Sequence, residues 1–254
     1  MQLITVHQVS KQFPYYDRNR PRTIMAAALS GWRRINPTDY FWALQHVSFT
    51  VDSGEMVGII GKNGAGKSTL LKLLGQVGVP DEGHIAVGAR VGALLDLGAG
   101  FHDHLTGREN VVVNGVVAGL LSREVLQRLD EIVEFAEIER FVDNPVRTYS
   151  TGMKMRLAFS LAVHTQPDIL LVDEHLAVGD RDFQDKCLNR IAQMKEQGCA
   201  IVLVSHNTDQ IAELCDRAIW LERGKVRAVG TASKIVEQYL NETHAADVLS
   251  PSIP

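Results

Sequence analysis

A glycine-rich segment in the first third of the chain has the residue types and spacing that bind phosphate. It reads Gly61-Lys62-Asn63-Gly64-Ala65-Gly66-Lys67-Ser68, which fits GxxxxGK[ST]. It follows an apolar run at 56–60 and opens a helical pattern, the context that this motif requires. Glycines let the backbone aim N–H groups at phosphate oxygens, and the helix N-terminus adds partial positive charge. We expect this loop and Thr69 to bind ATP, Lys67 to reach the β- and γ-phosphates, and Ser68 to ligate Mg²⁺.

Acidic residues follow the apolar run 169–172, which reads as a buried parallel strand. Ligands of open α/β sheets lie at the carboxyl ends of strands, so Asp173 is expected to hold Mg²⁺. Glu174 is then placed to accept a proton from an attacking water. His206 follows the next apolar run, 201–204, and is expected to hydrogen-bond the γ-phosphate as a second catalytic residue.

Composition limits the class of protein. The chain has 254 residues, a formal net charge of −4 and a pI near 6.1, which does not indicate a nucleic-acid binder. Its three cysteines form no CxxC pair, which favours buried, reduced thiols. No apolar run reaches the roughly 18 residues that span a bilayer. A membrane process would therefore need another chain to supply spanning helices.

Apolar periodicity indicates alternating strands and helices. Strands are expected at Leu3–Val9, Ala43–Val51, Met56–Ile60, Ile169–Val172, Ile201–Val204, Ala218–Leu221 and Val226–Val229. Helices are expected at Ser68–Leu74, across much of 106–162, around Cys187, Ile191 and Met194, and at Ala232–Leu240. Residues 14–40 break the first pattern as an arginine-bearing insertion. The small, polar residues 244–254 predict a flexible tail.

The segment Tyr149-Ser150-Thr151-Gly152-Met153 precedes Asp173 and is typical of a helix N-terminus with Ser150 as its cap. With the phosphate loop, the acidic pair and His206, it resembles the ATP-binding cassette (ABC) ATPases, whose signature is usually LSGGQ. The resemblance implies an α/β P-loop NTPase over residues 1–243. It also implies a RecA-like core, an antiparallel β subdomain and a helical subdomain at about 104–163.

In this family two cassettes stack head to tail, and each signature seals the ATP of the other cassette. The resemblance therefore implies a homodimer in which Ser150, Thr151 and Gly152 contact the partner's ATP. Asp180 would belong to the D-loop. The segments 97–101, 105–110 and 173–180 are similar to ATPases of bacterial polysaccharide exporters.

That narrower resemblance implies an ATPase at the cytoplasmic face of the bacterial inner membrane. It would power export of a lipid-linked polysaccharide through a separate transmembrane permease. O-antigen is the first choice, and capsule or teichoic acid is the alternative. A sugar-binding domain beyond the cassette is not expected in this chain.

Two departures from the family pattern leave site residues open. The usual Gln near Leu97 is absent, and Asp96 is the nearest polar residue that could take its place at the metal. Phe13 is the first candidate to stack on adenine, ahead of Tyr15, Tyr16, Phe41 and Trp42. The arginines of the insertion could meet anionic headgroups near the substrate's entry.

Two other functions compete with export. A soluble cassette ATPase acting on DNA or ribosomes would usually carry two cassettes, or long coiled-coil or basic insertions, unlike this chain. A nucleotide-sensing module would be expected to lack one of the catalytic residues, whereas Lys67, Asp173, Glu174 and His206 are all present.

Overall fold

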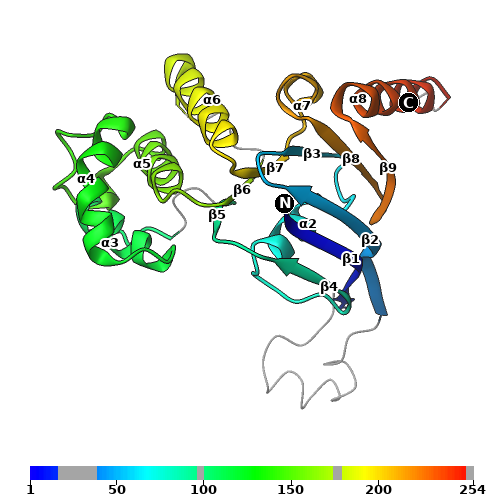
Figure 1. Cartoon of the computed structure of the whole chain (residues 1–254), viewed down its shortest axis with the longest axis horizontal. Helices are drawn as coiled ribbons and strands as arrows, with labels where there is room; N and C mark the ends of the chain where they lie inside the picture. Colours follow the sequence, from blue (N-terminus) through cyan, green and yellow to red (C-terminus); the bar gives the residue numbers. More distant parts are fainter. Residues whose placement is uncertain (17–38, 96–99, 174–178, 250–254) are drawn as a thin grey trace, which may run out of the picture.

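A six-stranded sheet forms the centre of the molecule (Figure 1). The structure is a computed structural model that describes residues 1–16, 39–95, 100–173 and 179–249. The strand order is β5-β6-β7-β3-β8-β9, and only the β8–β9 pair is antiparallel. These strands are β3 (Met56–Ile60), β5 (Val91–Leu94), β6 (Ile169–Val172), β7 (Ala200–Val204), β8 (Arg217–Glu222) and β9 (Lys225–Thr231).

A second, antiparallel sheet has the order β2-β1-β4, with β1 (Gln2–Tyr15), β2 (Asp39–Asp52) and β4 (Glu82–Val87). The insertion was expected over about residues 14–40, and the strands on both sides of it are longer than expected. Strand β1 continues through Tyr15 and β2 begins at Asp39, with Pro14 opposite Tyr40. The antiparallel ladder supplies partners that periodicity alone did not reveal. The arginines at positions 18–34 lie outside the described residues.

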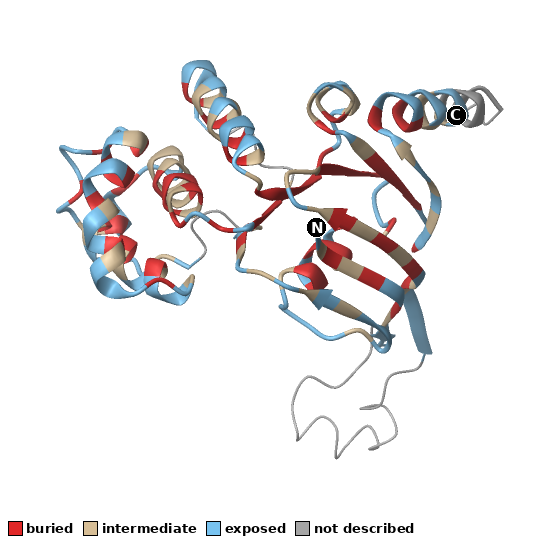
Figure 2. Cartoon of the chain, viewed as in Figure 1, coloured by how far each residue is buried: buried red, intermediate tan, exposed pale blue. Residues whose placement is uncertain are grey.

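The central sheet separates two apolar cores because its side chains alternate between faces. In β3, Val57 and Ile59 face the antiparallel sheet and helix α2 (Lys67–Leu74), which lies between the two sheets. Met56 and Ile60 face the other core. Figure 2 shows the inner strands β3, β6 and β7 buried, as expected for strands that are covered on both sides, whereas the edge strand β9 is exposed or half-buried.

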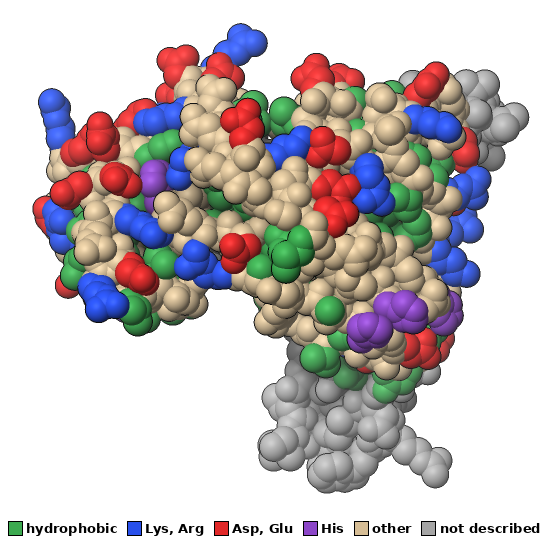
Figure 3. Space-filling model, viewed as in Figure 1, with side chains coloured by type: hydrophobic (Ala, Val, Ile, Leu, Met, Phe, Trp, Pro, Cys, Tyr) green, Lys and Arg blue, Asp and Glu red, His purple; other side chains and the backbone are tan. Residues whose placement is uncertain are grey.

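Helices α6 (Arg181–Glu196), α7 (Thr208–Leu214) and α8 (Ala232–Leu249) contribute to that second core. On the face seen in Figure 3, acidic and basic side chains are interspersed on the outer sides of the helices, as expected for amphipathic helices that cover a core. Helix α8 runs past residue 244, about where the flexible tail was expected to begin. Residues 250–254 lie outside the described part.

Helices α3 (Gly107–Val117), α4 (Ser122–Ala136) and α5 (Thr151–His164) form a helical subdomain at one end of the molecule, with a short 3₁₀ helix, η2 (Val146–Thr148). Its core includes Val125, Leu129 and Ile132 of α4, which recur at helical spacing. Helix α5 belongs to two cores, because Leu157 packs within this subdomain and Phe159 packs within the main core. This helix therefore joins the subdomain to the sheet.

Strands β4 and β5 were not predicted, because short strands rich in Gly and Ala give a weak alternation signal. The predicted burial of Cys187, Cys199 and Cys215 is confirmed, and all three thiols are free. Burial raises the pKa of each to about 12. Among the described residues, no helix combines the length and apolar content needed to cross a membrane.

Candidate nucleotide-binding site

The predicted site residues follow three neighbouring parallel strands. Strand β7 lies between β3 and β6, and all three run in the same direction. Gly61 follows β3, Asp173 follows β6, and His206 lies two residues after β7. The carboxyl ends of these strands therefore place the phosphate loop, the acid and the histidine at one edge of the sheet.

Lys67 begins helix α2 and is held inside the phosphate loop. Its Nζ donates to the carbonyl oxygen of Gly61 at 2.8 Å and to that of Lys62 at 3.3 Å. The side chain is only 5% exposed. These contacts fix the ammonium among the backbone groups of the loop, where a phosphate would be bound.

The loop's glycines adopt conformations that other residues avoid. Gly61, Gly64 and Gly66 have φ of 150°, 79° and 107°. A Cβ on Gly66 would lie 2.5 Å from the carbonyl oxygen of Ala43, whereas one on Gly64 would meet nothing within 4 Å. The loop is thus packed against strand β2 on one side and open at Gly64. Lys62, Asn63, Ser68 and Thr69 are at least partly accessible around that opening, while Ala65 is buried beneath it.

Two aromatic side chains pair across strands β1 and β2, close to the part of β2 that contacts the phosphate loop. Phe13 is opposite Phe41 in the register of β1 and β2, and their ring centroids are 6.0 Å apart. Both rings are exposed, at 39% and 53%. Phe41 is two residues before Ala43, whose carbonyl oxygen lies against Gly66, so the pair is close to the phosphate loop along β2. The structure therefore brings two of the candidates for stacking on adenine, Phe13 and Phe41, next to each other.

The segment 149–153 forms the start of α5, as predicted. Ser150 is the N-cap, and its Oγ accepts from the backbone N of Met153 at 3.2 Å. Tyr149 stands where the family signature has Leu. It is buried, and its hydroxyl donates to the carbonyl of Phe141 at 2.7 Å. Burial raises the pKa of Tyr149.

Gly107 explains how that larger side chain fits. A Cβ at Gly107 would collide with the Tyr149 hydroxyl, so the glycine leaves the space that the ring occupies. Thr151 and Gly152 occupy the first turn of α5, with Thr151 exposed and Gly152 partly exposed.

Asp180 is the N-cap of α6, and its Oδ1 accepts from the backbone N of Phe183 at 3.1 Å. Its Oδ2 accepts from Nη2 of Arg156 on α5 at 2.9 Å. Nothing in the sequence indicates this pairing, because ion pairs between helices leave no local pattern. Glu174 and Asp96 lie outside the described residues, so their predicted roles stay predictions.

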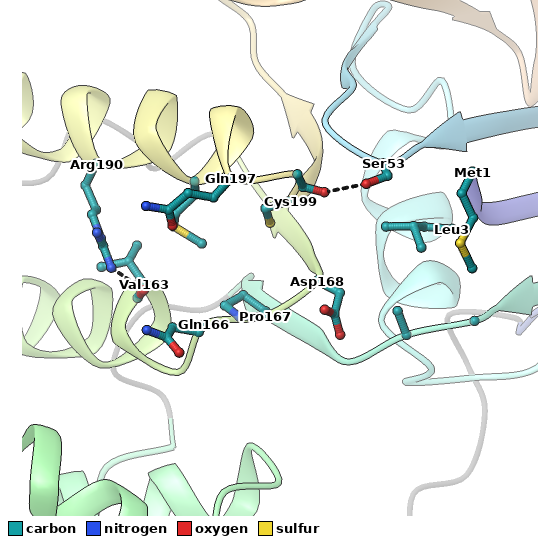
Figure 4. A pocket seen from close by; sticks show the side chains of 14 residues that line it. Met1, Leu3, Ser53, Val163, Gln166, Pro167, Asp168, Arg190, Gln197 and Cys199 are labelled. Atoms are coloured by element: carbon teal, nitrogen blue, oxygen red, sulfur yellow. Dashed lines mark hydrogen bonds between the residues drawn. The ribbon is translucent and has the colours of Figure 1, made fainter.

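A cavity of about 670 Å³ lies elsewhere in the described chain (Figure 4). Asp168, which precedes β6, and Cys199, which precedes β7, line it. It therefore lies at the amino ends of these strands, opposite the edge that carries the phosphate loop. Of the predicted site residues that the structure describes, none lines it.

Comparison with known proteins places the site in a family. The sequence model of the ABC transporter family matches residues 44–177. An O-antigen export system ATP-binding protein, RfbB, of Klebsiella pneumoniae is 42% identical over 93% of this chain and 97% of its own length. RfbB of Myxococcus xanthus is 46% identical over 87% of this chain, which spans 51% of that relative. A teichoic acids export ATP-binding protein, TagH, of Enterococcus faecalis is 43% identical over 80% of this chain and 45% of its own length.

Solved structures show the same architecture. An ATP-binding subunit of an ABC transporter superposes with a TM-score of 0.75 at 25% identity, covering 96% of this chain and 98% of that one. The cassette MJ0796, solved as a dimer bound to ADP and Pi, gives 0.72 at 22% identity over 90% and 98%. The predicted P-loop fold is confirmed, and the chain belongs to the ATP-binding subunits of the ABC transporter family.

Proposed function

We propose that this chain is the ATP-hydrolysing subunit of a bacterial exporter of lipid-linked polysaccharide, with O-antigen as the first candidate substrate. The observation that carries the proposal is the similarity to the Klebsiella RfbB protein along nearly the whole of both chains. It is supported by a phosphate loop whose lysine is already positioned inside the loop. Teichoic acid is the alternative, because the Enterococcus TagH protein, named for teichoic acid export, has about the same sequence identity to this chain as the Klebsiella RfbB protein. The match to TagH covers a smaller share of both chains.

ATP is assigned to the edge of the sheet where β3, β6 and β7 end. Backbone N–H groups of the loop and Lys67 neutralise the phosphates, and the Phe13–Phe41 pair offers an aromatic surface to the adenine. His206 is assigned to the γ-phosphate. Glu174, directly after Asp173, is assigned as the base that accepts a proton from the attacking water.

Mg²⁺ fits the donor set at this edge. Ser68 and Asp173 offer hydroxyl and carboxylate oxygens, the ligands that Mg²⁺ prefers. Within the described residues, no cluster of three or more His, Cys, Asp or Glu side chains could hold a metal. We assign the ion to the same site as the nucleotide, whose phosphates it would neutralise.

A second copy of the chain is assigned to complete each site. Gly152 has a wide opening beside it, since the nearest atom to a Cβ built there is Ser150 Oγ at 3.8 Å. The capped N-terminus of α5 therefore presents Ser150, Thr151 and Gly152 outward, where N–H donors favour an anion. By the resemblance to the family, we assign this anion as the γ-phosphate of the ATP that is bound to the phosphate loop of the second copy.

The membrane partner is assigned to a groove of about 400 Å³ beside the helical subdomain. Gly92 and Ala93 of β5, Val117 of α3 and Leu161 of α5 line it. Val117 is 80% exposed, and Val113, one helical turn earlier, is 47% exposed. Exposed apolar side chains on one helix face mark an interaction site. We assign a cytoplasmic segment of a transmembrane permease to this groove, which places the chain at the cytoplasmic face of the membrane.

The proposal is tested by co-expressing the chain with the membrane subunit and reconstituting both into vesicles. ATP-dependent movement of lipid-linked O-antigen is expected for the wild type, and none for Glu174→Gln, which should still bind ATP. Glu196→Gln, which changes an exposed carboxylate on α6, is the matched control and should transport normally. Movement of teichoic acid alone would select the alternative. ATP hydrolysis without any co-purifying membrane protein would contradict an export role.

A further inference from the structure

Arg156 joins three helices at the base of the helical subdomain. Its Nη1 donates to Oε2 of Glu137 at 2.6 Å, and its Nη2 donates to Oδ2 of Asp180 at 2.9 Å. The guanidinium carbon lies 4.5 Å from the ring centroid of Phe183. The side chain is only 17% exposed. A partly buried guanidinium that bridges two carboxylates over an aromatic ring has one well-defined orientation.

The two carboxylates lie on opposite sides of the subdomain junction. Glu137 is the C-cap of α4, in the left-handed conformation with φ of 58°. Lys186 of α6 also donates to Glu137, at 3.1 Å. The hydrogen bond from Lys186, with that from Arg156, holds the pKa of Glu137 below its usual range. Asp180 caps α6 on the core side. Arg156 therefore connects the end of α4 with the start of α6.

Arg156 also lies four residues after Gly152, one turn along the helix that carries the signature. The backbone at Gly179 leaves room for it, since a Cβ there would lie 3.2 Å from Arg156 Nε and φ is 76°. The signature and Asp180 are thus held in a fixed relation by one side chain.

We infer that Arg156 is a positioning residue. It fixes the position of the signature segment relative to Asp180, so that both contact the second cassette as one rigid surface. The inference rests on the proposed function, because it concerns the same ATP site in the dimer. Arg156 contacts Glu137, Asp180 and Phe183, and we assign it no contact with the nucleotide. It acts through Asp180, and its loss lets α5 and α6 shift relative to each other.

The test measures ATP hydrolysis and nucleotide affinity for Arg156→Met, Arg156→Lys, Asp180→Asn and the Arg156→Met/Asp180→Asn double variant. A shift of about 1 Å in a positioned group can cost about 100-fold in rate, so kcat of Arg156→Met should fall at least about tenfold. The affinity of the phosphate loop for nucleotide should not change. Lysine keeps the charge but contacts only one carboxylate at a time, so Arg156→Lys should restore part of kcat. The double variant should be no slower than the slower single variant.

Lys186→Met is the matched control, because it removes a cation from Glu137 without touching Asp180. Its kcat should stay within about twofold of wild type, a change that corresponds to well under 1 kcal/mol. An Arg156→Met variant with wild-type kcat, equal losses of kcat and nucleotide affinity, or additive losses in the double variant would overturn the inference. If Arg156→Met does not fold, Arg156→Lys and Asp180→Asn decide the matter with the same measurements. A wild-type chain that neither binds nor hydrolyses ATP would instead refute the proposed function.

Discussion

The phosphate loop and the signature segment both depend on glycine, but for different reasons. Gly66 has φ of 107°, and a side chain on it would strike the backbone of Ala43 in the same chain. Gly152 has no positive φ, and a Cβ built on it would meet only Ser150 Oγ, at 3.8 Å. The fold of the single chain therefore requires the first glycine and tolerates an alanine at the second.

That difference indicates that the segment around Gly152 contacts a partner outside this chain. Glycine near a helix start is less favourable than alanine by up to about 1 kcal/mol, so Gly152 weakens α5 without a benefit inside this chain. A close approach by something outside the chain would account for it. The proposed ATP of a second cassette is such a partner, and each prediction below tests one side of this contrast.

Lys67→Met should have the largest effect. Methionine fills the same space but removes the buried cation of the phosphate loop, and the carbonyl of Gly61 loses the hydrogen bond from Lys67. We expect kcat for ATP to fall by about 10³-fold, comparable to the loss of one strong charge-stabilising group at an active site. Isothermal titration of the single chain with ATP should also show weakened binding. Lys72→Met on the exposed side of the same helix is the control and should behave as wild type.

Gly152→Ala should separate activity from stability. The free energy of unfolding should stay the same or rise by up to about 1 kcal/mol, because alanine is the better helix former. ATP hydrolysis should nevertheless fall by about 10- to 100-fold, since an added methyl displaces the N–H donors from the proposed phosphate. Chemical denaturation and a steady-state ATPase assay measure the two quantities. Full activity in this variant would mean that nothing approaches Gly152 closely.

Gly66→Ala should show the reverse pattern in stability. Its Cβ would overlap the Ala43 carbonyl, and its φ is unfavourable for alanine, so the free energy of unfolding should fall by about 1–3 kcal/mol. Thermal melting without nucleotide measures this loss. A melting temperature equal to that of wild type would show that the loop relaxes, and that the contrast with Gly152 is smaller than the geometry indicates.

The sequence predicted those parts of the fold and site whose signal is local. Strand β3 and the cap at Ser150 were found from periodicity and residue type. The extension of β1 to Tyr15 was missed, because it depends on pairing with Asp39 in a strand far along the chain. The bridge from Arg156 to Glu137 and Asp180 was missed for the same reason. Contacts between distant segments are set by packing, which a single sequence does not display.

Ser150→Ala should give the smallest effect and should refine the signature side of the contrast. Loss of an N-cap hydroxyl costs about 1 kcal/mol of stability. Thr106→Ala is the matched control, because Thr106 caps α3 in the same subdomain through a hydrogen bond from the backbone N of Glu109. Both variants should therefore unfold at lower denaturant by similar amounts. Only Ser150→Ala should also lower ATP hydrolysis, because only Ser150 is assigned to the ATP of the second copy. Equal activity in the two variants would mean that Ser150 acts only as a helix cap. Gly152 would then be the remaining evidence that the signature segment contacts the ATP of a second copy.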